Sequence, residues 1–150
     1  MRALGIDFGS KRIGIAISNE EMTLATPLSV IYRSSNKVRD HQAIKELAEE
    51  WEAEVLVVGL PRSLDGGVGP AAENVLQEVK LLQKNTGLPL DTFDERFTTV
   101  TAKQVLRDQG ISEKEHKNLV DQVAASIMLQ AWLDHKKGTA APLTEVKNGS

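Results

Sequence analysis

The sequence predicts an α/β fold, a mixed sheet with helices on both faces. Three observations indicate this class. The chain opens with two alternating strand segments joined by a glycine-bearing turn, and helix and strand patterns then alternate along it. Residues 55–58 form a continuous apolar run, which is typical of a strand covered on both faces. We therefore expect this run to be a central strand of the sheet.

The first two strands separate bulky from small side chains. Alternation places Leu4, Ile6 and Phe8 on one face and Ala3, Gly5, Asp7 and Gly9 on the other; Ile13, Ile15 and Ile17 likewise oppose Arg12, Gly14, Ala16 and Ser18. Such small side chains let another group approach closely. We interpret the carboxylate of Asp7 as a ligand of a divalent metal, or of a phosphate through a metal. A turn-initiating aspartate in a hairpin is the alternative.

The remaining elements follow from periodicity and from helix stop signals. A third strand within residues 23–32 contains Pro27, which suits a sheet edge. We then expect, in order, a helix over residues 38–51, the strand at 55–58, a helix over 70–84 ended by residues 85–87, a strand over 90–94, a helix over 98–108 ended by Gly110, and a helix over 117–135. Residues 1–137 thus make one domain, and residues 138–150 are expected to form a flexible tail.

Composition narrows the function classes. The chain has 150 residues, which suits one domain, and it has no cysteine, which fits a reducing cytosol and excludes thiolate zinc sites. No secretory signal or membrane span is visible, so we expect a cytoplasmic protein without a membrane partner. The net charge of −3 argues against indiscriminate nucleic-acid binding, so any polyanion site must be a local basic patch.

Ligands of such sheets bind at the carboxyl ends of the parallel strands. Asp7 lies late in the first strand, residues 59–62 follow the buried strand, and residues 94–96 follow the next one. The glycine-rich residues 64–67 make the middle loop compact, so that backbone N–H groups and Arg62 can face an anion. Glu95 shares a face with Phe93, whereas Asp94 shares one with Thr92, and spacing alone does not select the inward carboxylate.

A second unusual carboxylate lies in the last helix. At about 100° per residue, Asp121 falls on the apolar side with Met128 and Trp132, away from a polar stripe on the same helix. An ionised carboxylate there costs several kcal/mol unless a partner offsets it. A buried salt bridge, a favourable charge near the helix N-terminus and a metal ligand are the three explanations.

Four motifs together resemble the YqgF (RuvX) family of RNase H-like nucleases: residues 7–9, residues 59–61 with 65–66, residues 94–96 and the helix carrying Asp121. The resemblance covers roughly residues 1–135 in the same order. It implies a β-β-β-α-β-α-β-α fold with a five-stranded sheet, and a metal-dependent nuclease with Asp7, Glu95 and Asp121 as catalytic residues and metal ligands. Family annotations point to processing of the 5′ end of pre-16S rRNA, alongside an older proposal of Holliday-junction resolution.

The expected mechanism is hydrolysis by two Mg²⁺ or Mn²⁺ ions about 4 Å apart that clamp the scissile phosphate. Asp7 would bridge the ions, while Glu95 and Asp121 would complete one site each. Lys11, Arg12, Arg62 and Arg96 lie on loops of the same edge and are candidate substrate-binding residues, although exposed cations are often only solvated surface. His41, His116 and His135 lie outside every motif and receive no role.

Several alternatives to RNA processing stay open at this point. RuvC-type resolvases can carry a further acidic residue where this chain has Ala124, three positions after Asp121, which argues against a resolvase-like site. An actin-like nucleotide-binding domain shares the hairpin pattern but needs two such domains, and a binding module without cleavage would not need the carboxylates. We expect an RNA precursor as substrate in preference to a DNA junction, with ribosomal precursor particles as a candidate partner and a homodimer as a further option.

Overall fold

The computed structural model describes residues 1–61, 69–94 and 113–140, with the side chains of residues 122–136 in the last of these ranges. In chain order, the elements are β1 (Arg2–Phe8), β2 (Arg12–Ser18), β3 (Ala25–Tyr32), α1 (Lys37–Glu50), β4 (Ala53–Leu60), α2 (Pro70–Thr86), β5 (Leu90–Asp94) and α4 (Glu113–Ala140). The predicted helix over residues 98–108 lies outside the described residues. Helix α4 extends the predicted last helix at both ends and includes residues 138–140, which the sequence analysis assigned to the tail.

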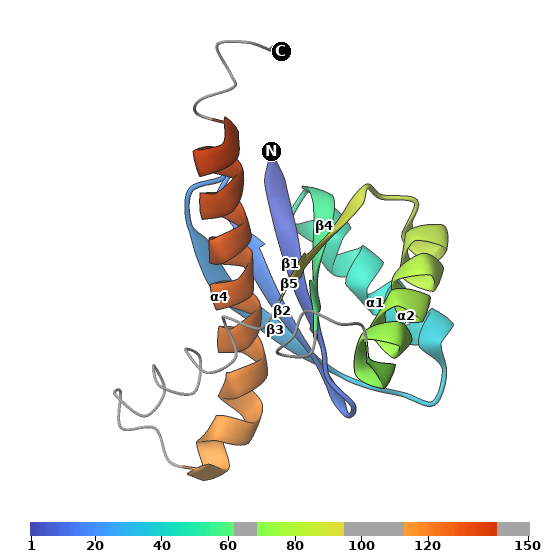
Figure 1. Cartoon of the computed structure of the whole chain (residues 1–150). Helices are drawn as coiled ribbons and strands as arrows, with labels where there is room; N and C mark the ends of the chain where they lie inside the picture. Colours follow the sequence, from blue (N-terminus) through green and yellow to red (C-terminus); the bar gives the residue numbers. More distant parts are fainter. Residues whose placement is uncertain (62–68, 95–112, 141–150) are drawn as a thin grey trace.

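The strands form one mixed sheet in the order β3-β2-β1-β4-β5 (Figure 1). β1 pairs antiparallel with β2 and parallel with β4, and β4 pairs parallel with β5. The apolar run in β4 is therefore an interior strand, as predicted, although β1 is the middle one. Strand β3 is an edge strand, and the register of its pairing with β2 shifts beside Pro27, which pairs with Ala16. The proline thus sits where a missing N–H is tolerated.

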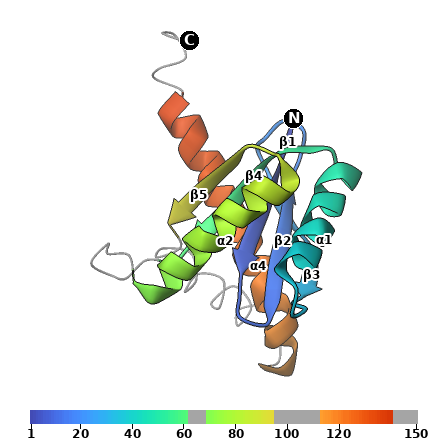
Figure 2. The same cartoon turned by 90° about the vertical axis from the view of Figure 1, so that its right-hand side faces the viewer.

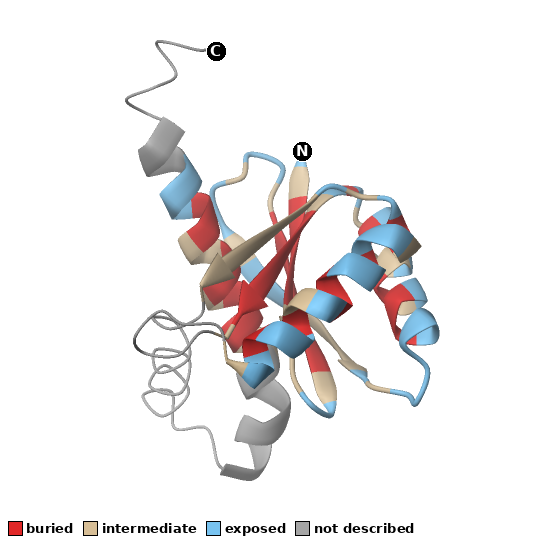
Figure 3. Cartoon of the chain, turned by 45° about the vertical axis from the view of Figure 1, so that its right-hand side comes forward, coloured by how far each residue is buried: buried red, intermediate tan, exposed pale blue. Residues whose placement is uncertain are grey.

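Helices cover both faces of the sheet, which confirms the predicted fold class (Figures 1 and 2). The bulky face of β1 and β2 packs with α1 and α2 in a core that includes Leu4, Ile6, Ile15, Ile44 and Leu82. The small face packs against α4, in a second core that includes Ala3, Ala16, Val57, Met128 and Leu129. Burial is therefore concentrated in the interior strands and in the inward sides of the helices (Figure 3).

Local signals set the helix ends near the predicted positions. The side chain of Asn36 caps α1 by accepting a hydrogen bond from the backbone N–H of Arg39. Helix α2 begins at Pro70, whose missing N–H is not needed in the first turn. It ends at Gly87, which has a φ of 71° and so adopts the left-handed conformation that glycine reaches without strain.

Helix α4 approaches the sheet closely at Gly5 in β1. A Cβ atom at this position would lie 2.9 Å from the Cβ of Leu129 and 3.3 Å from the carbonyl oxygen of Ala125. Both atoms belong to the helix near its backbone and cannot rotate away. The glycine therefore sets how closely α4 approaches the sheet.

We expect Gly5→Ala to destabilise the protein by about 1–3 kcal/mol, because the added methyl group forces the helix outwards. Gly69→Ser is the matched control, since nothing lies within 4 Å of a Cβ at that position and serine is a good N-cap residue. Urea unfolding followed by circular dichroism measures both. Equal stability of Gly5→Ala and the wild type would contradict the packing argument.

Candidate active site

The carboxyl ends of three parallel strands meet at one edge of the sheet. Ile6 pairs with Val58 in β4, and Leu60 at the end of β4 pairs with Asp94 at the end of β5. Asp7 is the penultimate residue of β1 and follows Ile6 at this edge. The tertiary structure thus brings together Asp7, the end of β4 and Asp94, as expected from the strand order.

Asp7 lies on the α4 face of the sheet. It alternates with Ala3 and Gly5, whose positions on that face are fixed by their packing against α4. The side chain is half-buried, at the point where β1 leaves the second core. Asp7 can therefore be reached from solvent while it is carried by the middle strand of the sheet.

The small face of β1 and β2 has a different explanation from the one that the sequence suggested. The small side chains predict that a metal or a phosphate approaches this face closely. The contacts instead assign it, at Ala3, Gly5 and Ala16, to helix α4. At Asp7 this face extends beyond the residues that pack in the second core.

Helix α4 runs back towards the same edge. It begins at the end of the sheet that carries the β1–β2 hairpin (Figure 1). Position 121 is one turn before Ala125, and Asp7 is two residues after Gly5, the residue that Ala125 contacts. Four residues of a helix span about 6 Å along its axis, and two residues of a strand span about 6.6 Å. Position 121 on α4 and Asp7 on β1 therefore lie at similar distances from the Gly5 contact, in the same direction along the sheet. The side chain of Asp121 itself lies outside the described residues.

Contacts of strand β5 show which side of the sheet Asp94 lies on. Asp91 accepts a hydrogen bond from the indole N–H of Trp132 in α4 at 2.8 Å, and Phe93 packs against the α4 core. Leu90 packs on the opposite side, against the α1–α2 core. By alternation, Asp94 lies on the side of Leu90, so it does not share the face of Asp7.

The other predicted site residues divide into two groups. Glu95, Arg62 and Arg96 lie outside the described residues. Lys11 and Arg12 are described, and both belong to the hairpin that follows Asp7. Among the described side chains there is no cluster of three or more His, Cys, Asp or Glu residues suited to a metal, so the metal ligand set stays a prediction.

A buried polar network beneath the hairpin was missed by the sequence analysis. Arg33 donates through Nε to the carbonyl oxygen of Gly9 at 2.7 Å and pairs through both terminal nitrogens with Glu78 at 2.9 Å. The second Glu78 oxygen lies 3.0 Å from Nε2 of His41, whose Nδ1 lies 2.9 Å from the Asn85 amide nitrogen. The sequence does carry a signal for this network. His41 and Glu78 are polar residues at helical spacing from the buried aliphatic residues of α1 and α2, so each lies on the apolar face of its helix.

The sequence profile of the RuvX family, described as Holliday junction resolvase, matches residues 1–135. The chain belongs to this family. It is 44% identical over 134 residues to a protein of Moorella thermoacetica and 40% identical over 136 residues to one of Halothermothrix orenii, both named "Putative pre-16S rRNA nuclease". The alignments cover 89% and 91% of this chain and 95% and 96% of the relatives.

Solved structures support the fold of this RuvX-family chain. Thermus thermophilus RuvC, in complex with a Holliday junction substrate, superposes with a TM-score of 0.58 at 19% identity, covering 93% of this chain and 97% of RuvC. The large terminase nuclease of the thermophilic phage G20c gives a TM-score of 0.51 at 12% identity, covering 88% of this chain and 81% of the phage chain. These likenesses confirm the predicted RNase H-like fold. The names of the family and of its members are those of nucleases, hydrolases that act on phosphodiester bonds, which confirms the predicted enzyme class.

No described helix of this RuvX-family chain is both long and apolar enough to cross a bilayer.

The Arg33–Glu78–His41 network fixes a charge inside the protein. Burial raises the pKa of a carboxyl group, but the hydrogen bonds from His41 and Arg33 outweigh it and lower the pKa of Glu78 from 4.5 to about 2. The ionised form of Glu78 is therefore favoured by folding. Glu78 contributes its full stabilisation when the pH is above its pKa in the unfolded chain. This stabilisation is lost as the pH falls towards its pKa in the folded protein.

We expect the wild-type chain to lose stability on the order of 3 kcal/mol between about pH 5 and pH 2 from this group, since one pKa unit corresponds to about 1.4 kcal/mol. Glu78→Gln should be less stable at neutral pH and should show a flatter acid limb. Glu73→Gln, an exposed residue in the first turn of α2, is the control. Urea midpoints measured across this pH range test the prediction, and identical acid limbs for wild type and Glu78→Gln would contradict it.

Proposed function

We propose that this protein is a metal-dependent nuclease that processes the 5′ end of pre-16S rRNA. The observation that carries the proposal is the position of Asp7. It stands on the middle strand at the carboxyl edge of the sheet, half-buried, on the face against which α4 packs. The relatives that share about 40% of the sequence are named for pre-16S rRNA. Their alignments cover nearly the whole of both chains, which supports transfer of the substrate class.

We assign Asp7, Glu95 and Asp121 as catalytic residues and metal ligands. One finding favours this set over one with Asp94, and a second supports the inclusion of Asp121. Asp94 lies on the opposite side of β5 from the residues that contact α4, and the backbone of position 121 advances along α4 in step with Asp7 along β1. Carboxylates are the ligands that Mg²⁺ and Mn²⁺ prefer.

The chemical roles follow from this placement. Bound Mg²⁺ or Mn²⁺ would supply a water activated for attack and would neutralise charge on the scissile phosphate. Asp7 would hold its ligand oxygens on a strand paired on both sides, which limits their movement. Lys11 and Arg12 in the adjoining hairpin, together with Arg62 and Arg96, would attract and orient the phosphates of the substrate strand.

Junction resolution is the second candidate, because the family description and the RuvC structure name Holliday junctions. Position 124 argues against a RuvC-like ligand set, since Ala124 is a buried core residue of α4 with a relative exposure of 6%. Burying an ionised carboxylate at this position would cost desolvation free energy, which alanine does not. We therefore favour the RNA precursor, and a homodimer and a ribosomal precursor particle belong to this proposal as candidate partners.

Replacing Asp7 or Asp121 with Asn, or Glu95 with Gln, is expected to reduce Mn²⁺-dependent cleavage at least about 100-fold, because even groups that only orient metal ligands contribute 10–100-fold. Asp94→Asn and Asp134→Asn, the latter at an exposed position of α4, are the controls and should keep activity. Melting temperatures without metal should stay equal or rise, since neighbouring carboxylates repel one another. Loss of folding in Asp121→Asn would instead favour a buried salt bridge, and loss of activity in Asp94→Asn would overturn the choice of Glu95.

We expect the purified chain with Mn²⁺ to cut single-stranded RNA from the 5′ flank of the small-subunit precursor in preference to a four-way DNA junction. Gel analysis of end-labelled substrates at equal concentration measures the ratio of the two rates. Paired, symmetric nicks in the junction without cleavage of the RNA would reverse the choice of substrate, while the assignment of the carboxylates would be unaffected.

A further inference from the structure

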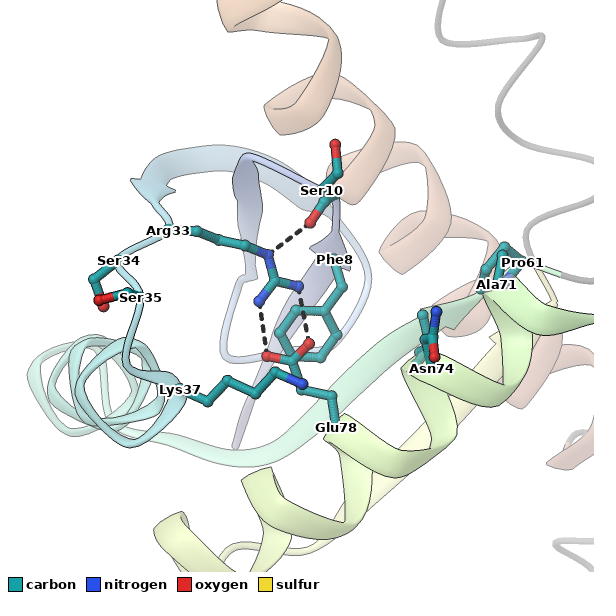
Figure 4. Close-up of a pocket in the computed structure, with 12 residues that line it drawn as sticks. Phe8, Ser10, Arg33, Ser34, Ser35, Lys37, Pro61, Ala71, Asn74 and Glu78 are labelled. Atoms are coloured by element: carbon teal, nitrogen blue, oxygen red, sulfur yellow. Dashed lines mark hydrogen bonds and ion pairs between the residues drawn. The ribbon is translucent and has the colours of Figure 1, made fainter.

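A pocket of about 580 Å³ opens at the same edge of the sheet on the α1–α2 side (Figure 4). Phe8 and the hairpin residues Gly9 and Ser10 form one wall, the segment from Arg33 to Lys37 forms another, and the first turns of α2 form the third. Phe8 follows Asp7 directly, and consecutive strand residues point to opposite faces. The pocket therefore lies across β1 from the proposed catalytic carboxylate, one residue away along the chain.

The side chain of Arg33 forms a flat surface in this pocket. Its guanidinium carbon lies over the Phe8 ring, 5.2 Å from the ring centre, so the group packs against an aromatic side chain. Its nitrogens are held at their edges by Gly9 and by the two oxygens of Glu78. The side chain is still 17% exposed and lines the pocket. The exposed part belongs to a side chain whose guanidinium is already fixed in place by these contacts.

The same contacts decide which chemical group this surface suits. The charge of Arg33 is matched by Glu78, whose lowered pKa keeps it ionised at neutral pH. Gly9 and Glu78 accept hydrogen bonds from three of the five N–H groups of the guanidinium, and its charge is compensated, so Arg33 is a weaker phosphate ligand than an unpaired arginine. A rigid, planar and charge-compensated group is instead suited to stacking on a nucleobase, and proteins bind unstacked RNA bases on arginine planes in this way.

The rim of the pocket suits the rest of a nucleotide. Lys37, Ser35 and Asn74 line the opening and are exposed. Helix α2 directs its N-terminus here, and its N-cap residue, Gly69, has no side chain that could cap the first N–H groups. These groups can donate to a sugar or a phosphate beside the base. The volume also falls within the range of about 300–1,000 Å³ typical of small-molecule sites.

We propose that this pocket binds one nucleobase of the substrate strand, unstacked from its neighbours and laid on the guanidinium of Arg33. Because the pocket and Asp7 lie on opposite sides of one strand end, the base belongs to a nucleotide next to the cleaved phosphodiester bond. The proposal rests on the proposed nuclease function. It adds a site that accepts a base only where the substrate is single-stranded. It also gives Arg33 a binding role.

The test is an abasic scan. Short single-stranded RNA from the precursor flank, with one abasic nucleotide placed at each position around the cut, is titrated into the full chain in EDTA and followed by fluorescence anisotropy. We expect one position at which the missing base weakens binding about tenfold, because stacking of a base contributes roughly 1–3 kcal/mol. A 4-thiouridine at that position should crosslink to pocket residues such as Phe8 or Asn74.

Two variants separate stacking from structural support. Arg33→Lys keeps a positive charge beside Glu78 but removes the plane, so the abasic penalty should disappear. His41→Gln disturbs the same network from outside the pocket lining, so the penalty should remain. Equal penalties in both variants, a flat scan in the wild type, or crosslinks confined to α4 would each overturn the proposal.

Cleavage of the unmodified RNA by the wild-type chain with Mn²⁺ is measured in parallel. RNA that is cut while the abasic scan is flat overturns the base pocket and leaves the nuclease function standing. RNA that is neither bound nor cut overturns the proposed RNA substrate, and the pocket assignment with it.

Discussion

The contact between α4 and Gly5 is the constraint on which the geometry of the candidate site depends. A helix can pack this closely only where the strand lacks a side chain, and Leu129 and Ala125 occupy the space of the missing Cβ. The same contact fixes the position of the helix relative to β1. Position 121 and Asp7, which lie on different elements, are therefore placed relative to one another by packing in an apolar core.

The other side of β1 is fixed by polar contacts. Arg33 joins the hairpin at Gly9 to Glu78 in α2, and His41 in α1 supports Glu78 in turn. Burying the carboxylate of Glu78 alone would be strongly unfavourable, and Arg33 and His41 supply its partners. The turn that follows Asp7 is consequently held by the helix layer on the far side of the sheet, while Asp7 itself faces α4.

This arrangement gives the two faces of one strand end different chemistry. Asp7 points towards the side where a nuclease of this family would hold metal ions, and Phe8 points towards the pocket floored by Arg33. A strand of nucleic acid that crosses the carboxyl edge of the sheet would meet both. Preorganised side chains on rigid strands limit the entropy lost on binding, which is the physical advantage of placing a hydrolytic site at such an edge.

The sequence by itself determined the order of elements and the two faces of the hairpin, because alternation and helical periodicity are local properties of the backbone. It also placed Asp7 and residues 94–96 at strand ends, where the parallel topology makes them neighbours. Only the tertiary structure decided that the small face of β1 serves mainly to seat α4, and that Asp94 lies on the side opposite to Asp7. It alone revealed the Arg33–Glu78–His41 network. These features depend on contacts between residues far apart in the chain, such as Gly5 with Leu129 and Arg33 with Glu78, and no local pattern specifies which distant side chains will meet.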